Sequence, residues 1–140
     1  MSILFHKEEI EVQLPDEKKL TQWLCNIAGT EDKKVKQVTY IFCDDEYLLE
    51  INKQFLNHDF YTDIITFPYK QGSEIESDIF ISVDRVRENA TLYKVDFDRE
   101  LLRVIAHGLL HLMGYKDKTK EEEKVMRAQE DLAIERFYEL

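Results

Sequence analysis

Residues 99–117 read RELLRVIAHGLLHLMGYKD, and this stretch contains both the main helical pattern of the chain and its candidate functional residues. Apolar residues recur in it at helical spacing, which predicts a helix from about Arg99 to Met113. Gly114 follows directly, where a residue in the left-handed conformation commonly ends a helix and turns the chain back. The sequence therefore predicts a largely buried helix with a sharp turn at its carboxyl end.

Two histidines and an aspartate stand at the end of this helix with the spacing of metal ligands. His107 and His111 are four residues apart, so their imidazoles lie on one helix face, one turn from each other. Asp117 comes three residues after Gly114 and is placed to supply a third ligand. Two imidazoles and one carboxylate leave a fourth tetrahedral position for water, which is typical of a catalytic rather than a structural zinc site.

A simpler interpretation makes His107 and His111 ordinary polar residues of an amphipathic helix. A pair with this spacing is by itself a weak signal for a metal. However, both residues lie within an otherwise apolar run, where two buried imidazoles without a shared partner would be costly. We therefore predict a metal site formed by His107, His111 and Asp117.

The sequence on either side alternates strand and helix signals and has few breakers. We expect an α+β fold in one domain, residues 1–140, with a small mixed sheet of about four strands packed with about five helices. The expected strands are residues 2–13, 37–43, 62–69 and 77–82. The expected helices begin at Asp16, Asp44–Asp45, residue 84, Asp96 or Asp98, and Thr119, and Gly29 is placed to end the first of them.

Two of these helices carry apolar stripes that predict which side they bury. In the second helix the stripe consists of Leu48, Ile51, Phe55 and Leu56. Thr119 and Glu122 form a capping box at the start of the last helix. There we expect one broad buried side made of Val125, Met126, Ala128, Leu132, Ala133 and Phe137, interrupted by Gln129 and Arg136.

The chain is acidic, with 29 Asp and Glu against 19 Lys and Arg and a net charge of −10. This balance argues against tight binding of nucleic acid over the whole surface. However, residues 85–120 hold eight Lys and Arg against five Asp and Glu, so the acidity is concentrated elsewhere. No run approaches the roughly 20 apolar residues of a membrane span. The sequence therefore indicates a cytoplasmic protein without a membrane partner and permits a local, metal-centred contact with RNA.

The spacing of the two histidines, Gly114 and Asp117 overlaps that of metzincin-type metalloproteases. Those enzymes place a glutamate directly after the first histidine as the general base. Here Gly108 occupies that position and has no side chain. A metalloprotease-like hydrolase therefore remains an alternative that lacks its catalytic base.

A second family fits these residues better. HGLLHLMGYKD, at residues 107–117, resembles the motif of the YbeY family, in which His-Gly-x-Leu-His-Leu-x-Gly-Tyr is followed by Asp-His. Asn52, Asp59 and TDIITFP at 62–68 are similar to its segment ending Thr-(Asn/Asp)-Val-Leu-Ser-Phe-Pro. SDIFIS at 77–82 is similar to its Gly-Asp-Ile-x-Ile-Ser strand.

This resemblance implies a single-domain α+β endoribonuclease that depends on a metal, usually zinc. It would act on single-stranded RNA in ribosomal RNA maturation, notably at the 3′ end of the small-subunit RNA, and in ribosome quality control. Its partners would be ribosomal RNA, the small ribosomal subunit and ribosome-associated proteins. The resemblance implies that His107 and His111 ligate one ion and act in catalysis through it, and that Asp117 stands where the family has a third histidine.

Two departures from the family pattern bear on activity. A carboxylate at Asp117 adds a negative charge, which lowers the ion's pull on water and phosphate and favours harder divalent metals. Leu56 stands where the family has an arginine that is thought to serve the active site. A ribosome-associated binding factor without cleavage activity is therefore a further alternative.

Other basic residues are candidates to replace that arginine. Lys116 and Lys118 flank Asp117 and are expected to contact phosphate. His58 precedes the TDIITFP segment and is a further candidate substrate-binding residue, although an exposed loop histidine is an equally good interpretation. Arg103 lies one turn before His107 and faces either the site or solvent.

Overall fold

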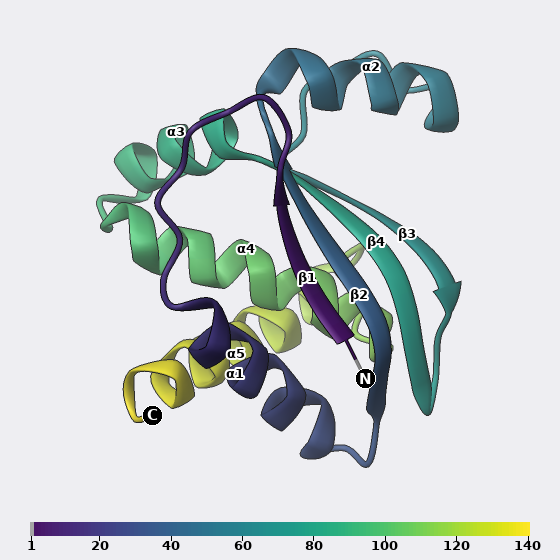
Figure 1. The fold of residues 1–140 in the computed structure, drawn as a ribbon, viewed down its shortest axis with the longest axis vertical. Helices are drawn as coiled ribbons and strands as arrows, with labels where there is room; N and C mark the ends of the chain where they lie inside the picture. The colour runs from purple at the N-terminus through teal and green to yellow at the C-terminus, as the bar shows by residue number, and fades with distance from the viewer. Residues whose placement is uncertain (1) are drawn as a thin grey trace.

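Four strands and five helices follow one another through residues 2–140, the part of the chain that the computed structural model describes (Figure 1). They are β1 (Ser2–Lys7), α1 (Glu17–Gly29), β2 (Lys34–Cys43), α2 (Asp45–Leu56), β3 (Ile64–Lys70), β4 (Glu74–Ser82), α3 (Val83–Tyr93), α4 (Phe97–Leu112) and α5 (Lys120–Tyr138). The α+β class, the mixed sheet and the numbers of strands and helices expected from the sequence are confirmed over these residues.

The strands form one sheet in the order β1-β2-β4-β3. β2 pairs in parallel with β1 and with β4, whereas β3 pairs antiparallel to β4. The hairpin between β3 and β4 turns at Gly72, whose φ of 96° lies in the region that glycine adopts without strain. Parallel strands need crossover connections, which α1 and α2 with their loops provide.

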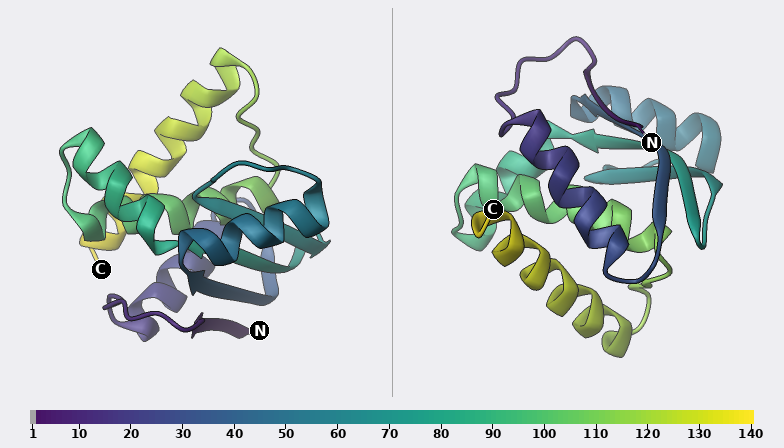
Figure 2. Two further views of the ribbon diagram at one scale, coloured as in Figure 1. Left: turned by 90° about the horizontal axis from the view of Figure 1, so that it is seen from above. Right: turned by 60° about the horizontal axis from the view of Figure 1, so that its bottom comes forward.

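The two faces of the sheet have different covers because side chains alternate along each strand. On one face, Val38, Tyr40 and Ile79 belong to the main core together with buried residues of α1, α4 and α5. On the other face, Cys43 and Ile65 form a small cluster with Leu48 of α2. The right view of Figure 2 shows α2 on the opposite side of the sheet from α1, α4 and α5. Helix α4, which carries His107 and His111, therefore lies on the main-core side.

Helix α4 is held against both the sheet and its neighbouring helices. The hydroxyl of Tyr40 donates a hydrogen bond to the Ile105 carbonyl at 2.9 Å. Gly108 allows the closest approach, because a Cβ atom built there would lie 2.9 Å from Cδ1 of Ile64 and 3.2 Å from two side-chain atoms of Ile79. On the other side, Trp23 of α1 donates to the Ala133 carbonyl of α5 at 2.7 Å. The contacts of Ile105 and Gly108 fix α4 on the sheet, and the Trp23 hydrogen bond joins α1 to α5.

Three local predictions from the sequence were wrong. The first strand ends at Lys7 rather than at residue 13, because Glu9 adopts a positive φ of 51° that breaks extended backbone. In α2, Phe55 and Leu56 are exposed, because this helix packs through Leu48, Asn52 and the half-buried Ile51.

The buried side of α5 also differs from the expected one. Val125, Ala128 and Leu132 are exposed, and the buried residues are Met126, Glu130, Ala133, Ile134 and Phe137. The side that packs against the protein is therefore rotated relative to the expected stripe and contains a glutamate. The capping box at Thr119 and Glu122 is confirmed.

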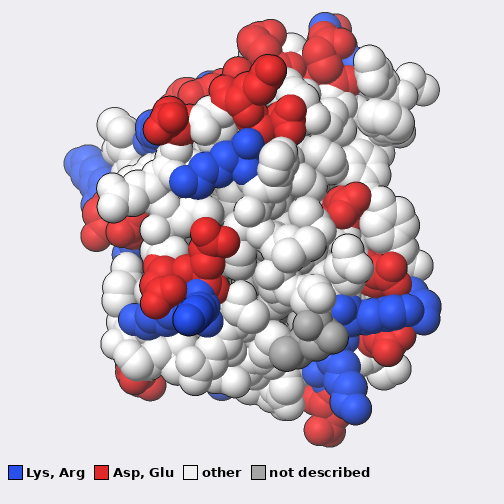
Figure 3. All heavy atoms as spheres, in the orientation of Figure 1, with Lys and Arg blue, Asp and Glu red and all other residues white. Residues whose placement is uncertain are grey.

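Charge is unevenly distributed over the surface. On the face drawn in Figure 3, acidic side chains gather in the upper part, where Figure 1 places α2, α3 and the loop after β1. Within residues 2–140, none of the helices combines the length and the apolar character needed to cross a bilayer.

Candidate metal centre

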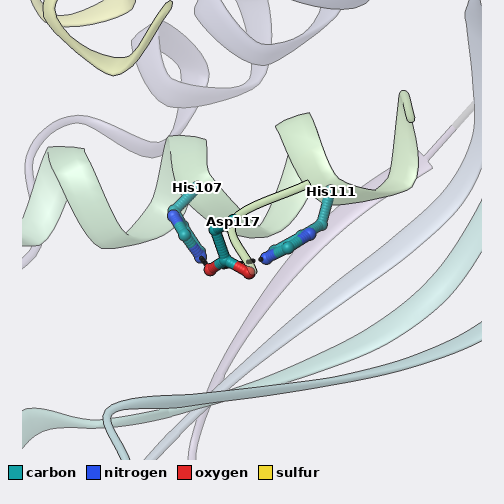
Figure 4. Close-up of side chains that lie close together, drawn as sticks. All are labelled: His107, His111 and Asp117. Atoms are coloured by element: carbon teal, nitrogen blue, oxygen red, sulfur yellow. Dashed lines mark hydrogen bonds and ion pairs between the residues drawn. The ribbon is translucent and has the colours of Figure 1, made fainter. Parts of the chain in front are cut away.

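Helix α4 places His107 and His111 on one side, at the edge of the core. Asp96 caps the helix by accepting a hydrogen bond from the Arg99 amide at 2.8 Å, so of the two aspartates considered from the sequence it is Asp96 that starts the helix. The two imidazole rings lie one turn apart, with ring centroids 4.6 Å apart and planes at 85°. Both rings point to the same point in space, as Figure 4 shows.

The turn after α4 brings Asp117 to that point. Gly114 adopts a φ of 110°, and the Tyr115 amide donates back to the Leu110 carbonyl at 3.1 Å. This closes the helix and reverses the chain, as expected for a left-handed terminal glycine. The Asp117 carboxylate then lies between the two rings (Figure 4).

The two distances from Asp117 to the histidines match the donor separations of a tetrahedral metal site. Oδ2 of Asp117 lies 3.3 Å from Nε2 of His107 and 3.2 Å from Nε2 of His111, and one donor atom from each of the three residues lies within 4.8 Å of the other two. Metal–ligand bonds of about 2.0–2.1 Å place tetrahedral donors about 3.3 Å apart. Charge-assisted hydrogen bonds are shorter, about 2.7–2.9 Å. The arrangement therefore fits a shared cation better than a hydrogen-bonded trio.

A buried glutamate on α5 holds the far side of the His107 ring. Oε2 of Glu130 lies 2.6 Å from Nδ1 of His107, and because the carboxylate only accepts hydrogen bonds, Nδ1 is the donor. Nε2 is then left with its lone pair for a metal. Glu130 is fixed in turn by Arg103, whose guanidinium donates to Oε1 of Glu130 at 2.9 Å and to Asp131 at 2.6 Å.

The carboxylates around His107 decide its charge in the absence of a metal. Burial lowers the pKa of the imidazole, but the hydrogen bond that the ring donates to Glu130 and the negative charges of Glu130, Asp117 and Asp63 outweigh this effect, so the pKa is raised. Burial also raises the pKa of Asp63, against the opposing effect of the His107 charge. A cation bound at the three ligands would replace the proton that these carboxylates attract.

Two cavities open beside this cluster. One, of about 270 Å³, lies between α3, α4 and α5 and is lined by Asp63, Asn89, Tyr93, Glu100, Arg103, Val104, His107, Asp117, Arg127 and Glu130. The other, of about 320 Å³, is lined by His107, Asp117, Glu123, Met126, Arg127 and Glu130. Polar surface dominates the first cavity, which therefore suits a charged, hydrated ligand better than an apolar one.

The structure brings together His107, His111 and Asp117, but it leaves His58 elsewhere. The His58 ring stacks on Phe60, with centroids 5.0 Å apart, and lines a separate cavity together with Leu56. Lys116 and Lys118 are exposed on either side of Asp117, and neither lines the two cavities beside the cluster. Arg103 faces the site, where Glu130 binds it.

Glu130 and Arg127 are the residues that the sequence reasoning missed. A signal for Glu130 exists, because it stands four residues after Met126 and three before Ala133, within the side of α5 that is buried. A carboxylate inside an apolar stripe requires a buried partner. Arg127 carries no such signal, since its neighbourhood depends on how α5 crosses α4.

Comparison with known proteins agrees with this geometry. A family model described as "Endoribonuclease YbeY" matches residues 2–138. Proteins named Endoribonuclease YbeY are 51% identical in Cytophaga hutchinsonii, covering 95% of this chain and 94% of theirs, and 48% identical in Flavobacterium psychrophilum, covering 93% of each. A solution structure from Thermotoga maritima is 28% identical, with a TM-score of 0.69 over 98% of this chain and 89% of that one.

The family match covers both the helix with its two histidines and the strands that support it. The resemblance inferred from HGLLHLMGYKD is confirmed by the family model and by the curated relatives. This chain belongs to the endoribonuclease YbeY family.

Proposed function

We propose that this protein is a metal-dependent endoribonuclease that cleaves single-stranded RNA during maturation of ribosomal RNA, at the 3′ end of the small-subunit RNA. Residues 1–140 act as one hydrolase domain, in the cytoplasm with the ribosomes. The observation that carries the proposal is the set of donor separations of 3.2 and 3.3 Å at His107, His111 and Asp117, in a chain of this family.

The ligand set favours one zinc ion. Two imidazole nitrogens and one carboxylate oxygen are a common catalytic zinc set with a position left for water. When bound, the ion supplies a Lewis acid for a phosphate oxygen and lowers the pKa of its water. The carboxylate of Asp117 also permits a harder divalent metal such as Mn²⁺.

The residues of this chain then have distinct tasks. His107 and His111 hold the cation through Nε2. Asp117 contributes an anionic ligand from a turn rather than from the helix. Glu130 accepts the Nδ1 proton of His107 and so keeps the ring in the ligating tautomer, and Arg103 holds Glu130. Ligating histidines usually have such a carboxylate partner.

Single-stranded RNA is the substrate form that the site favours. The ligands lie at a helix end beside open cavities, where a splayed backbone can enter more easily than a duplex. Lys116 and Lys118 are exposed on both sides of Asp117 and are placed to contact flanking phosphates. His58, beside Leu56, is a more distant contact for the same strand.

The two alternative functions, a peptidase and a binding factor without cleavage activity, explain fewer features of the structure. A peptidase would need a glutamate at position 108, where a side chain would run into Ile64 and Ile79. A ribosome-associated binding factor without cleavage is favoured by Leu56 alone, which leaves no guanidinium at that position.

The test compares wild type with His111→Ala on a single-stranded RNA, both purified identically and assayed beside a mock preparation to measure contaminating nucleases. We expect metal-dependent cleavage by wild type, loss on chelation, recovery when zinc or Mn²⁺ is returned, and none by the variant. Equal residual cleavage by both proteins would refute the enzymatic function. Binding to the small subunit without cleavage of any RNA would select the binding factor.

A further inference from the structure

One arginine is common to the two cavities beside the metal-ligand cluster. Arg127 of α5 lines both, together with His107, Asp117 and Glu130. Its side chain is exposed, so the guanidinium is within reach of a ligand that enters either cavity. It stands three residues before Glu130, on the side of α5 that faces α4.

Arg127 differs from Arg103, the other arginine of the first cavity. Arg103 is saturated by Glu130 and Asp131 and has 12% of its side chain exposed. Arg127 makes no ion pair within 4.0 Å in residues 2–140. It interacts electrostatically with the buried Glu100 carboxyl, and its guanidinium lies over the ring of Tyr93, whose centroid is 5.7 Å from Cζ. A guanidinium stacked on an aromatic ring keeps its edge donors available for an anion.

We propose that Arg127 is a phosphate-binding residue that places the RNA backbone against the His107, His111 and Asp117 cluster. This inference rests on the proposed ribonuclease function and names one of its substrate contacts. Tyr93 of α3 holds the guanidinium from the other side of the first cavity.

The surrounding charges make this contact selective. Carboxylates of Asp63, Glu100, Asp117, Glu123 and Glu130 line the two cavities, and Arg103 is engaged with one of them. An RNA phosphate is therefore repelled from most of the lining and attracted to two places, the bound cation and Arg127. Retention of the strand consequently depends on both.

The experiment measures RNA affinity in the metal-loaded protein rather than cleavage alone. The probe is a fluorescent 2′-O-methyl single strand, titrated by anisotropy at several salt concentrations and checked on a gel for integrity. The proteins are wild type, Arg127→Ala, Arg127→Gln, Arg127→Lys and the matched control Arg136→Ala, an exposed arginine of the same helix. Zinc content is measured for each.

We expect Arg127→Ala and Arg127→Gln to weaken binding about 10- to 100-fold, as loss of a charged hydrogen bond does. The slope of log affinity against log salt should fall by about 0.7, the share of one phosphate on a single strand. Arg127→Lys should keep that slope, Arg136→Ala should change affinity by less than about twofold, and zinc content should stay constant.

Two results overturn the inference while leaving the proposed function in place. One is a wild type that cleaves RNA while both neutral variants bind with unchanged affinity and salt slope. The other is an equal loss in Arg136→Ala, which would make the effect one of net charge. A wild type that neither binds nor cleaves single-stranded RNA would refute the function and this contact together.

Discussion

The imidazole of His107 on α4 and the carboxylate of Glu130 on α5 are joined by a hydrogen bond of 2.6 Å between Nδ1 and Oε2. The two residues are 23 positions apart, and Glu130 is 4% exposed. His111 has no such partner within the described residues, since its one side-chain hydrogen bond is to Asp117. The two histidines are therefore held differently. His107 is oriented by Glu130, whereas the only side-chain hydrogen-bond partner of His111 among residues 2–140 is Asp117, a member of the same candidate ligand set.

Replacing Glu130 by Gln should weaken zinc binding by about 10- to 100-fold, the usual effect of losing a carboxylate behind a ligating histidine. The measurement is a competition titration with a chromophoric chelator. Nitrogen NMR of the metal-free protein, at a pH where the His107 ring is neutral, should also show His107 changing from a single tautomer to a mixture. Glu135→Gln, which removes the same charge from an exposed position of α5, serves as the control. Equal affinities for all three proteins would rule out a positioning role.

The sequence predicted the parts of this site that are local in the chain. The i, i+4 spacing placed His107 and His111 on one face, and the freedom of Gly114 predicted the turn to Asp117. These depend on neighbours within ten residues. Glu130 and Arg127 were missed because their roles depend on how α5 packs on α4. The apolar pattern of α5 alone does not define that packing.

The same reasoning explains the errors in the fold. Val125 and Leu132 are apolar but exposed, and Glu130 is charged but buried, because buried partners across the helix interface outweigh hydrophobicity at these positions. At the N-terminus, Val12 is buried although it is not in a strand. The apolar character of Val12 therefore indicates its burial but not its secondary structure. The strand ends earlier because the loop holds Glu9 at a positive φ.

Asp117 should be required for full metal occupancy. Asp117→Asn keeps the size of the side chain but weakens its donor, so we expect zinc content after dialysis to fall well below one ion per chain. Asp117→His restores an imidazole where this family is expected to have one and should retain zinc. Elemental analysis of both variants beside wild type is the measurement. Unchanged occupancy in Asp117→Asn would remove Asp117 from the ligand set.

Gly108 should tolerate no large polar side chain. Gly108→Glu would direct a carboxylate toward Ile64 and Ile79, and burial of an unpaired charge should lower the free energy of unfolding by about 3 kcal/mol or more. Urea unfolding in the presence of chelator measures this, and Gly108→Ala separates the effect of the Cβ atom from that of the charge. A Glu variant as stable as wild type, or one with peptidase activity, would contradict the structural reason for excluding a protease.

The buried carboxyl of Glu100 should make stability depend on pH. Burial raises its pKa, the charge of Arg103 opposes this, and the negative charge of Asp63 adds to it. A carboxyl whose pKa is higher in the folded than in the unfolded state favours folding when protonated, so its contribution is present below the unfolded pKa and is lost as pH rises through the folded pKa. Glu100→Gln stays neutral and lacks this loss. Urea unfolding in chelator at pH 4 and pH 7.5 should therefore show the variant gaining stability relative to wild type at the higher pH, and a difference that is constant or reversed between the two pH values would show that Glu100 ionises without cost.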